Sequence, residues 1–140
     1  MPKILIVEDT EDTRNYMESV LEIEGFDVVV AADGLEGINK FCSELPDLVI
    51  TDISMPHLDG FELIHRIRSG PIHNNVPILA ITSYGMDKAM EAIKGGADRA
   101  LARPVDNHLL VAFVADLLAK VTSPKESTNA PTEVRKPELL

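Results

Sequence analysis

Five short apolar runs recur along this chain, separated by longer segments whose apolar residues have helical spacing. Runs of this length that are rich in valine and isoleucine are typical of strands buried on both faces of a sheet. The runs are KILIV at 3–7, DVVVAA at 27–32, DLVIT at 47–51, PILAIT at 77–82 and RALA at 99–102. Their alternation with helices predicts a parallel sheet that carries helices on both faces.

Apolar residues between these runs recur at intervals of three and four, as on one face of a helix. Crossovers between parallel strands are right-handed, so few topologies remain. Five strands then predict an α/β fold with strand order 2-1-3-4-5, a (βα)5 flavodoxin-like doubly wound sandwich. The expected helix faces are Tyr16, Met17, Val20, Leu21 and Ile23; Leu35, Ile38, Phe41 and Cys42; Phe61, Ile64 and Ile67; Met86, Met90 and Ile93; and Leu109, Leu110, Phe113, Val114, Leu117, Leu118 and Val121.

The composition changes after Val121. Residues 123–140 contain three prolines and few apolar side chains, which indicates a disordered tail or a linker rather than part of the core. We therefore expect one domain over residues 1–122. A docking peptide within 123–140, and a further domain beyond it, remain open alternatives.

The charge of the chain excludes some classes of partner. Residues 123–140 hold three basic and three acidic residues, so the formal charge of -10 lies wholly within residues 1–122. An acidic domain argues against direct binding of nucleic acid and against docking on an anionic membrane.

The start of the chain does not resemble a signal peptide, and no apolar run is long enough for a membrane span. The single cysteine, Cys42, excludes an intramolecular disulfide and is expected to be a buried core thiol, which fits a cytoplasmic protein.

Polar and charged residues stand at the ends of four predicted strands. In this fold, ligands bind beyond the carboxyl ends of the strands, near the point where the strand order reverses. The side chains expected to meet at that edge are Glu8 and Asp9 at the end of the first strand, Asp52 at the end of the third, Thr82 and Ser83 at the end of the fourth, and Arg103 with Pro104 at the end of the fifth.

Three neighbouring carboxylates repel one another unless a cation compensates their charge. Glu8, Asp9 and Asp52 offer only oxygen ligands, so they indicate a Mg²⁺ site rather than a zinc site. Asp52 is the candidate nucleophile, because an ionised carboxylate can accept a phosphoryl group without a separate base. The cation, the Thr82 hydroxyl and the Arg103 guanidinium would then neutralise the phosphoryl oxygens.

These residues identify a family resemblance. Over residues 2–121 the chain resembles the receiver domain of bacterial two-component response regulators, in particular the single-domain type related to chemotaxis regulators. The resemblance rests on four motifs that occur in order and at suitable spacing, namely ILIVED at 4–9, LVITDISMPHLDG at 48–60, ILAITS at 78–83 and GGADRALARP at 95–104.

The resemblance implies a signalling phosphoacceptor, not an enzyme that acts on an external small molecule. Asp52 would be the phosphoacceptor, Glu8 would complete the acidic pair, and Asp9, Asp52 and the main-chain carbonyl of Ser54 would bind Mg²⁺. The Thr82 hydroxyl would move toward the phosphoryl group. A histidine kinase or a histidine phosphotransfer protein would be the donor, with the domain assisting the transfer. A downstream effector would bind the face formed by the fourth helix, the fifth strand and the fifth helix.

Two residues depart from the family pattern. Receivers usually have lysine where this chain has Arg103, and an arginine there either binds the phosphate or pairs permanently with Asp52 or Asp9. The family commonly has tyrosine or phenylalanine at the position of Ala100, and alanine has no rotamer to switch. The resemblance also implies a cis peptide bond between Arg103 and Pro104.

Two alternative functions for this fold conflict with residues at the expected site, and a third remains open. A hydrolase of the haloacid dehalogenase type requires an aspartate two residues after the nucleophile, where this chain has Ser54. A flavin-binding protein would need a phosphate-accepting loop where EDTEDT at 8–13 is acidic. An interaction module that is never phosphorylated, with Arg103 locking the site, is the remaining alternative.

Overall fold

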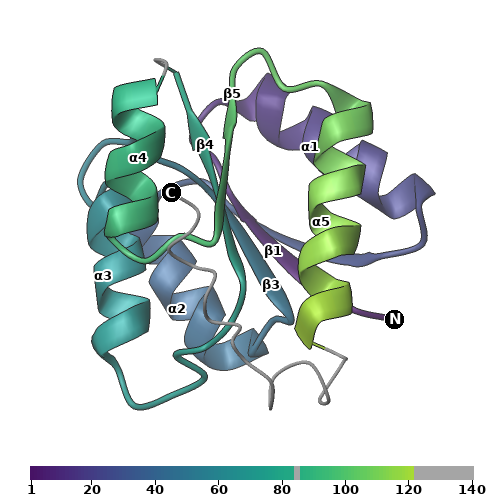
Figure 1. Cartoon of the computed structure of the whole chain (residues 1–140). Helices are drawn as coiled ribbons and strands as arrows, with labels where there is room; N and C mark the ends of the chain where they lie inside the picture. Colours follow the sequence, from purple (N-terminus) through teal and green to yellow (C-terminus); the bar gives the residue numbers. More distant parts are fainter. Residues whose placement is uncertain (84–85, 122–140) are drawn as a thin grey trace.

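The protein is an α/β sandwich built on one parallel five-stranded sheet (Figure 1). The computed structural model describes residues 1–83 and 86–121, so the predicted tail at 123–140 lies outside the described residues. The strand order β2-β1-β3-β4-β5 confirms the predicted topology. The strands are β1 Lys3–Val7, β2 Asp27–Ala31, β3 Leu48–Asp52, β4 Ile78–Thr82 and β5 Arg99–Ala102.

Helices cover both faces of the sheet, as the alternating pattern predicts. Figure 1 shows α1 and α5 on one face and α2, α3 and α4 on the other. No helix in the described ranges is both long and apolar enough to span a membrane. The helices are α1 Glu11–Ile23, α2 Gly34–Glu44, α3 Gly60–Ser69, α4 Met86–Lys94 and α5 Asn107–Val121.

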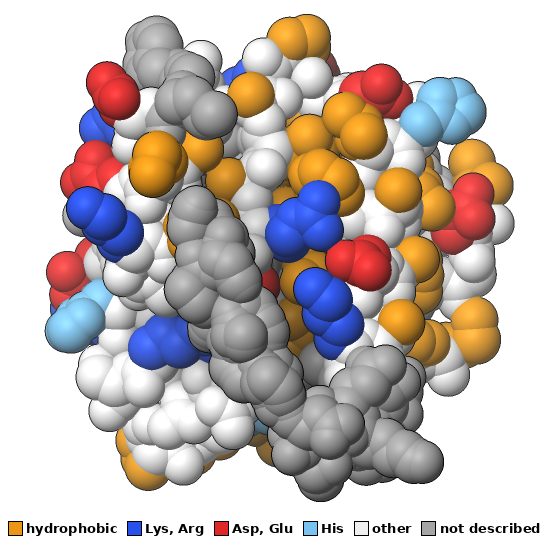
Figure 2. All heavy atoms as spheres, in the orientation of Figure 1, with side chains coloured by type: hydrophobic (Ala, Val, Ile, Leu, Met, Phe, Trp, Pro, Cys, Tyr) orange, Lys and Arg blue, Asp and Glu red, His pale blue; other side chains and the backbone are white. Residues whose placement is uncertain are grey.

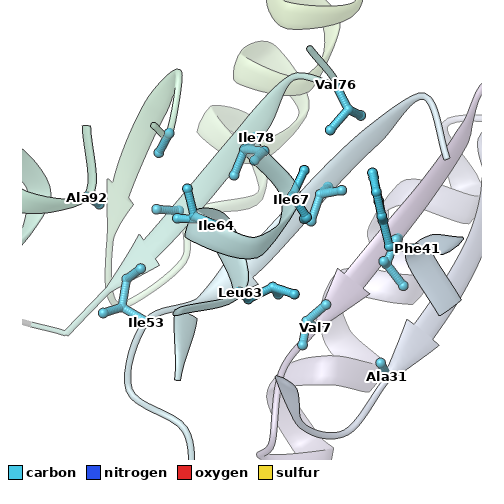
Figure 3. Close-up of a cluster of buried hydrophobic side chains, with 14 of the residues drawn as sticks. Val7, Ala31, Phe41, Ile53, Leu63, Ile64, Ile67, Val76, Ile78 and Ala92 are labelled. Carbon is cyan, nitrogen blue, oxygen red and sulfur yellow. The ribbon is translucent and has the colours of Figure 1, made fainter. Parts of the chain in front are cut away.

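Successive side chains of each strand enter opposite faces of the sheet, so the domain has two hydrophobic cores. Ile4 and Ile6 of β1 pack in the core beneath α1 and α5, where Met17 is also fully buried. Val7 belongs to the second core, beneath α2, α3 and α4, which Figure 3 shows with Leu63 of α3. Because both faces of the central strands are buried, β1 and β3 read as continuous apolar runs in the sequence.

Local hydrogen bonds orient the helix that follows β3. The Asp59 side chain accepts a hydrogen bond from the Glu62 backbone N–H at 2.9 Å, which caps the N-terminus of α3. Gly60 donates its N–H to the Ile53 carbonyl at 2.9 Å. A Cβ at Gly60 would lie 2.7 Å from the Ile53 Cα, so only glycine lets α3 start this close to the end of β3.

Several residues expected in the core are exposed instead. Cys42 is exposed, so its prediction as a core thiol was wrong. On α2 the buried stripe contains Gly34 and Gly37, two small residues that let the helix approach the sheet and that turn Leu35 and Cys42 outward. The other expected core residues with large exposed fractions are Tyr16 and Ile23 of α1, Met90 and Ile93 of α4, and Leu109 of α5.

Candidate functional site

The carboxyl ends of the strands bring together an acidic cluster from two strands that are adjacent in the sheet. Glu8 and Asp9 follow β1, and Asp52 is the last residue of β3. One carboxylate oxygen of each residue lies within 4.8 Å of the others. All three ligand atoms are oxygens, so the set suits a hard divalent cation such as Mg²⁺ and not a soft metal.

Asp52 is held at the end of a buried strand and is itself only 3% exposed. Its Oδ1 accepts a long hydrogen bond of 3.4 Å from the Ser54 N–H, and its Oδ2 lies 3.1 Å from a guanidinium nitrogen of Arg103. Ser54 itself is exposed at the start of the loop that leads to α3. The carboxylate therefore stands at the carboxyl edge of the sheet with one contact on each oxygen, and its role as phosphoacceptor remains a prediction.

Glu8 and Asp9 are sequence neighbours with opposite environments. Glu8 is completely buried, and both of its carboxylate oxygens have partners. Its Oε1 accepts from Arg103 at 2.7 Å, and its Oε2 accepts from the Thr10 N–H at 3.1 Å. Asp9 is exposed. Glu8 is thus held by shorter contacts than Asp52, while Asp9 is open to solvent.

Arg103 follows β5 and reaches across the edge of the sheet to both buried acids. Its backbone N–H donates to the Thr82 carbonyl at 2.8 Å, and its peptide bond to Pro104 is cis. The guanidinium pairs with Glu8 as well as Asp52. In the described residues it makes no ion pair with Asp9, which was one of the two partners considered from the sequence.

The pKa of Asp52 is raised from 3.8 to about 6. Burial is the largest cause, because it disfavours the charged form, and the neighbouring Glu8 carboxylate raises the pKa further. Arg103 and the Ser54 N–H act in the opposite direction. The carboxylate still predominates at pH 7, about nine tenths ionised for such a pKa.

Thr82 ends β4 beside this cluster and is 1% exposed. Its hydroxyl has no hydrogen-bond partner among the described residues. A buried hydroxyl without a partner is unfavourable by about 1–3 kcal/mol, so Thr82 is a donor without an acceptor at the edge of the sheet. Ser83, the next residue, is exposed.

Two cationic residues near the site were missed in the sequence. Arg14 of α1 donates to the Glu8 carbonyl at 2.9 Å, a contact between residues six apart that no helical spacing signals. Lys88 of α4 lies with its Nζ 5.5 Å from the centre of the Phe61 ring. Lys88 lines an open hollow of about 330 Å³ together with Ile53, Ser54, Met55, Pro56, Asp59 and Phe61. No local motif in the sequence pairs α4 with α3 in this way.

Comparison with known proteins agrees with this geometry. A family model described as the response regulator receiver domain matches residues 4–115. The chain belongs to the response regulator receiver domain family. Receiver domains are signalling domains rather than enzymes of the usual kind. The resemblance inferred from the four sequence motifs is therefore confirmed.

Solved structures of receiver domains share the fold. A putative response regulator from Chloroflexus aurantiacus superimposes with a TM-score of 0.81 at 34% identity, covering 84% of this chain and 98% of that chain. The chemotaxis response regulator CheY4 of Vibrio cholerae gives a TM-score of 0.79 at 30% identity, covering 84% of this chain and 98% of that chain. The flavodoxin-like architecture predicted from the strand pattern is thus the architecture of these receiver domains.

Curated relatives differ in length. An uncharacterized 14.6 kDa protein of Leptolyngbya boryana is 38% identical over 112 residues, covering 79% of this chain and 86% of that protein. The transcriptional regulatory protein CpxR homolog of Haemophilus influenzae is 34% identical over 128 residues, covering 91% of this chain but 55% of that protein. The chain thus spans about half the length of several curated relatives that it matches.

Proposed function

We propose that this receiver domain is the phosphoacceptor in a histidine-to-aspartate phosphorelay and that Asp52 receives the phosphoryl group. The observation that carries the proposal is the buried Asp52 carboxylate at the end of β3. It has Arg103 at 3.1 Å and, on the neighbouring strand, the Thr82 hydroxyl, which has no partner in the part of the chain that the structure describes. A phosphoryl group on Asp52 would provide the acceptor oxygens that Thr82 lacks and the negative charge that Arg103 binds.

In the transfer step, an Asp52 oxygen attacks the phosphorus of a phosphohistidine. The new O–P bond forms as the N–P bond breaks, and the electron pair of that bond returns to the imidazole of the donor. No general base is required, since the Asp52 carboxylate predominates at neutral pH. The contribution of this chain is to hold the nucleophile in place and to neutralise the transferring oxygens with Arg103 and Thr82.

Asp9, Asp52 and the main-chain carbonyl of Ser54 are the groups that would hold Mg²⁺. An oxygen-only donor set at this edge fits that ion. When bound, the ion supplies positive charge to the phosphoryl oxygens in the transfer. Glu8 would hold Arg103 in position beside the metal site, because its two oxygens accept hydrogen bonds from Arg103 and from the Thr10 N–H.

The donor, a histidine kinase or a histidine phosphotransfer protein, must bring its histidine to the carboxyl edge of the sheet. Helix α1 begins at Glu11, directly beside Asp9, so a docked donor would lie along it. Tyr16 is 42% exposed and Ile23 is 83% exposed, which leaves apolar surface on α1 next to several exposed acids. A partner with apolar residues flanked by basic ones would complement this helix.

The effector would bind the face formed by α4, β5 and α5. Met90 of α4 and Leu109 of α5 are exposed, and the guanidinium of Arg99 in β5 stacks 4.0 Å from the centre of the Phe113 ring in α5. Figure 2 views this side of the molecule, where Lys and Arg side chains stand among hydrophobic ones. Ala100 of β5 is half-buried against the core under α4. Because alanine has no side-chain rotamer to change, signalling to this face would proceed without an aromatic switch.

The domain assignment forms part of the proposal. Residues 1–122 would form the receiver domain, and residues 123–140 would be a tail or a linker. The part of the chain that the structure describes supports the first statement, because β1 to α5 form one sheet with its covering helices over residues 3–121.

Phosphorylation by a small donor tests the proposal. Incubating the chain with Mg²⁺ and acetyl phosphate should add one phosphoryl group that hydroxylamine removes, as measured by intact mass. Asp52→Asn should abolish the adduct, whereas Asp59→Asn, which changes an exposed carboxylate in the same loop, should retain it. An adduct that survives in Asp52→Asn would refute the assignment. Absence of an adduct on the unaltered chain with acetyl phosphate and with candidate kinases would favour a phosphorylation-independent interaction module.

A further inference from the structure

One nitrogen of Arg103 bridges two buried carboxylates. This Nη2 atom lies 2.7 Å from Glu8 Oε1 and 3.1 Å from Asp52 Oδ2. Glu8 is fully buried, Asp52 is almost so, and the Arg103 side chain is 25% exposed. The guanidinium thus already supplies positive charge to the acidic cluster, in a place where water screens the pair weakly.

The same cluster is the one that a divalent cation would occupy. Asp52 belongs both to the ion pair with Arg103 and to the set of three carboxylates with oxygens within 4.8 Å of one another. A cation that binds Asp52 therefore meets a carboxylate whose charge is already partly neutralised. The two positive groups also repel each other at this short range, so binding of one weakens binding of the other.

We propose that Arg103 is a resident counter-ion of the acidic cluster that competes with Mg²⁺ for Asp52 and so sets the metal affinity of the domain. The inference rests on the proposed function of the site. Glu8 is the anchor in this arrangement, because its shorter contact keeps the guanidinium at the edge of the sheet when the contact with Asp52 is released. Arg103 is then placed to pair with a phosphoryl group on Asp52.

The chemistry of arginine suits this role. The guanidinium stays protonated at every physiological pH, so the counter-charge is permanent. It is planar and has several N–H donors, so one can remain on Glu8 while another turns to a new acceptor. A lysine ammonium is a compact and strongly hydrated point charge on a flexible stem, and it would bridge the two acids less firmly.

Magnesium binding in the full-length chain tests the inference without any phosphorylation. MgCl₂ is titrated into ¹⁵N-labelled protein at pH 8, and amide shifts of the residues around Asp52 give the dissociation constant. Arg103→Gln is expected to bind Mg²⁺ about tenfold more tightly than the unaltered chain, the factor for losing one charge-assisted hydrogen bond. Arg103→Lys is expected to fall between the two.

Arg14→Gln is the matched control. It also removes one positive charge from the cluster, but Arg14 contacts the main-chain carbonyl of Glu8 and not a carboxylate. Its effect is therefore expected to be about twofold to threefold at most in physiological salt. A double-mutant cycle adds the anchor, since Glu8→Gln should weaken Mg²⁺ binding more when Arg103 is present than in the Arg103→Gln background.

Three outcomes test the competition between Arg103 and Mg²⁺, and a fourth tests the metal site itself. Equal affinities in Arg103→Gln and the unaltered chain would overturn the competition, and so would equal gains in Arg103→Gln and Arg14→Gln. If Arg103→Gln does not fold, Arg103→Lys decides the matter, with an unchanged affinity counting against competition. Failure of every variant and of the unaltered chain to bind Mg²⁺ would instead refute the metal site of the proposed function.

Discussion

Replacing Asp52 with asparagine should stabilise the metal-free protein at neutral pH. Asparagine keeps the size of the side chain but removes the buried charge. Asp52 has a pKa of about 6 in the fold against 3.8 ordinarily, so the folded state holds its proton more tightly than the unfolded state. Between these two pH values the fold loses stability as pH rises, and above pH 6 the full cost is present.

The size of this effect follows from the two pKa values. A pKa difference of about 2 corresponds to about 3 kcal/mol of unfavourable free energy above pH 6. Asp52→Asn should therefore raise the free energy of unfolding by up to about 3 kcal/mol at pH 7.5. For a domain of this size that is about 10 °C in the melting temperature. Near pH 4 most of the advantage should be gone, because Asp52 is then protonated in the folded state and nearly half protonated in the unfolded state.

Urea and thermal unfolding followed by circular dichroism in EDTA measure this prediction over the range pH 4 to 8. Asp9→Asn is the control, since Asp9 lies in the same cluster but is exposed and should change stability by less than about 0.5 kcal/mol. The reasoning is refuted if Asp52→Asn is no more stable than the unaltered chain at pH 7.5. It is also refuted if any gain persists undiminished at pH 4.

Three further perturbations test other parts of the structure. Thr82→Val, which keeps the shape of the side chain and removes only the hydroxyl, should leave the stability of the unphosphorylated domain unchanged or slightly higher in urea unfolding, because the hydroxyl has no partner among the described residues, while the yield or lifetime of the phosphoryl adduct falls. Gly60→Ala should destabilise the fold by about 1–3 kcal/mol, since the new Cβ would press on the end of β3. Arg68→Ala should destabilise it by about 2–3 kcal/mol, because Arg68 donates to three backbone carbonyls, whereas its ion pair with the half-exposed Asp98 adds little.

The order of elements and the edge of the sheet that carries the site were readable from local patterns. Apolar runs of strand length, separated by helical segments, are set by short-range periodicity, and parallel strands necessarily place their carboxyl ends at one edge. Asp52, Thr82 and Arg103 each follow such a run, so their approach could be predicted without knowing any contact.

Burial of individual side chains was less predictable, because it depends on how elements meet. Cys42 and Leu35 fit the apolar spacing of α2, yet the helix packs on Gly34 and Gly37 instead. Small residues do not count in a hydrophobic pattern, although they determine which side of a helix comes closest to the sheet. In helix α1, Met17 and Leu21 are fully buried, whereas Ile23 at the end of the helix is left 83% exposed.

The sequence by itself determined the fold, the membership of the acidic cluster and the candidate phosphoacceptor, since periodicity and strand order are enough for these. Only the tertiary structure decided how the charges are distributed within that cluster. Glu8 and Asp9 are neighbours in the chain, but one is buried and paired with Arg103 while the other faces solvent. The raised pKa of Asp52 and its shared guanidinium depend on distances between residues far apart in the chain, and such distances exist only once the strands have assembled.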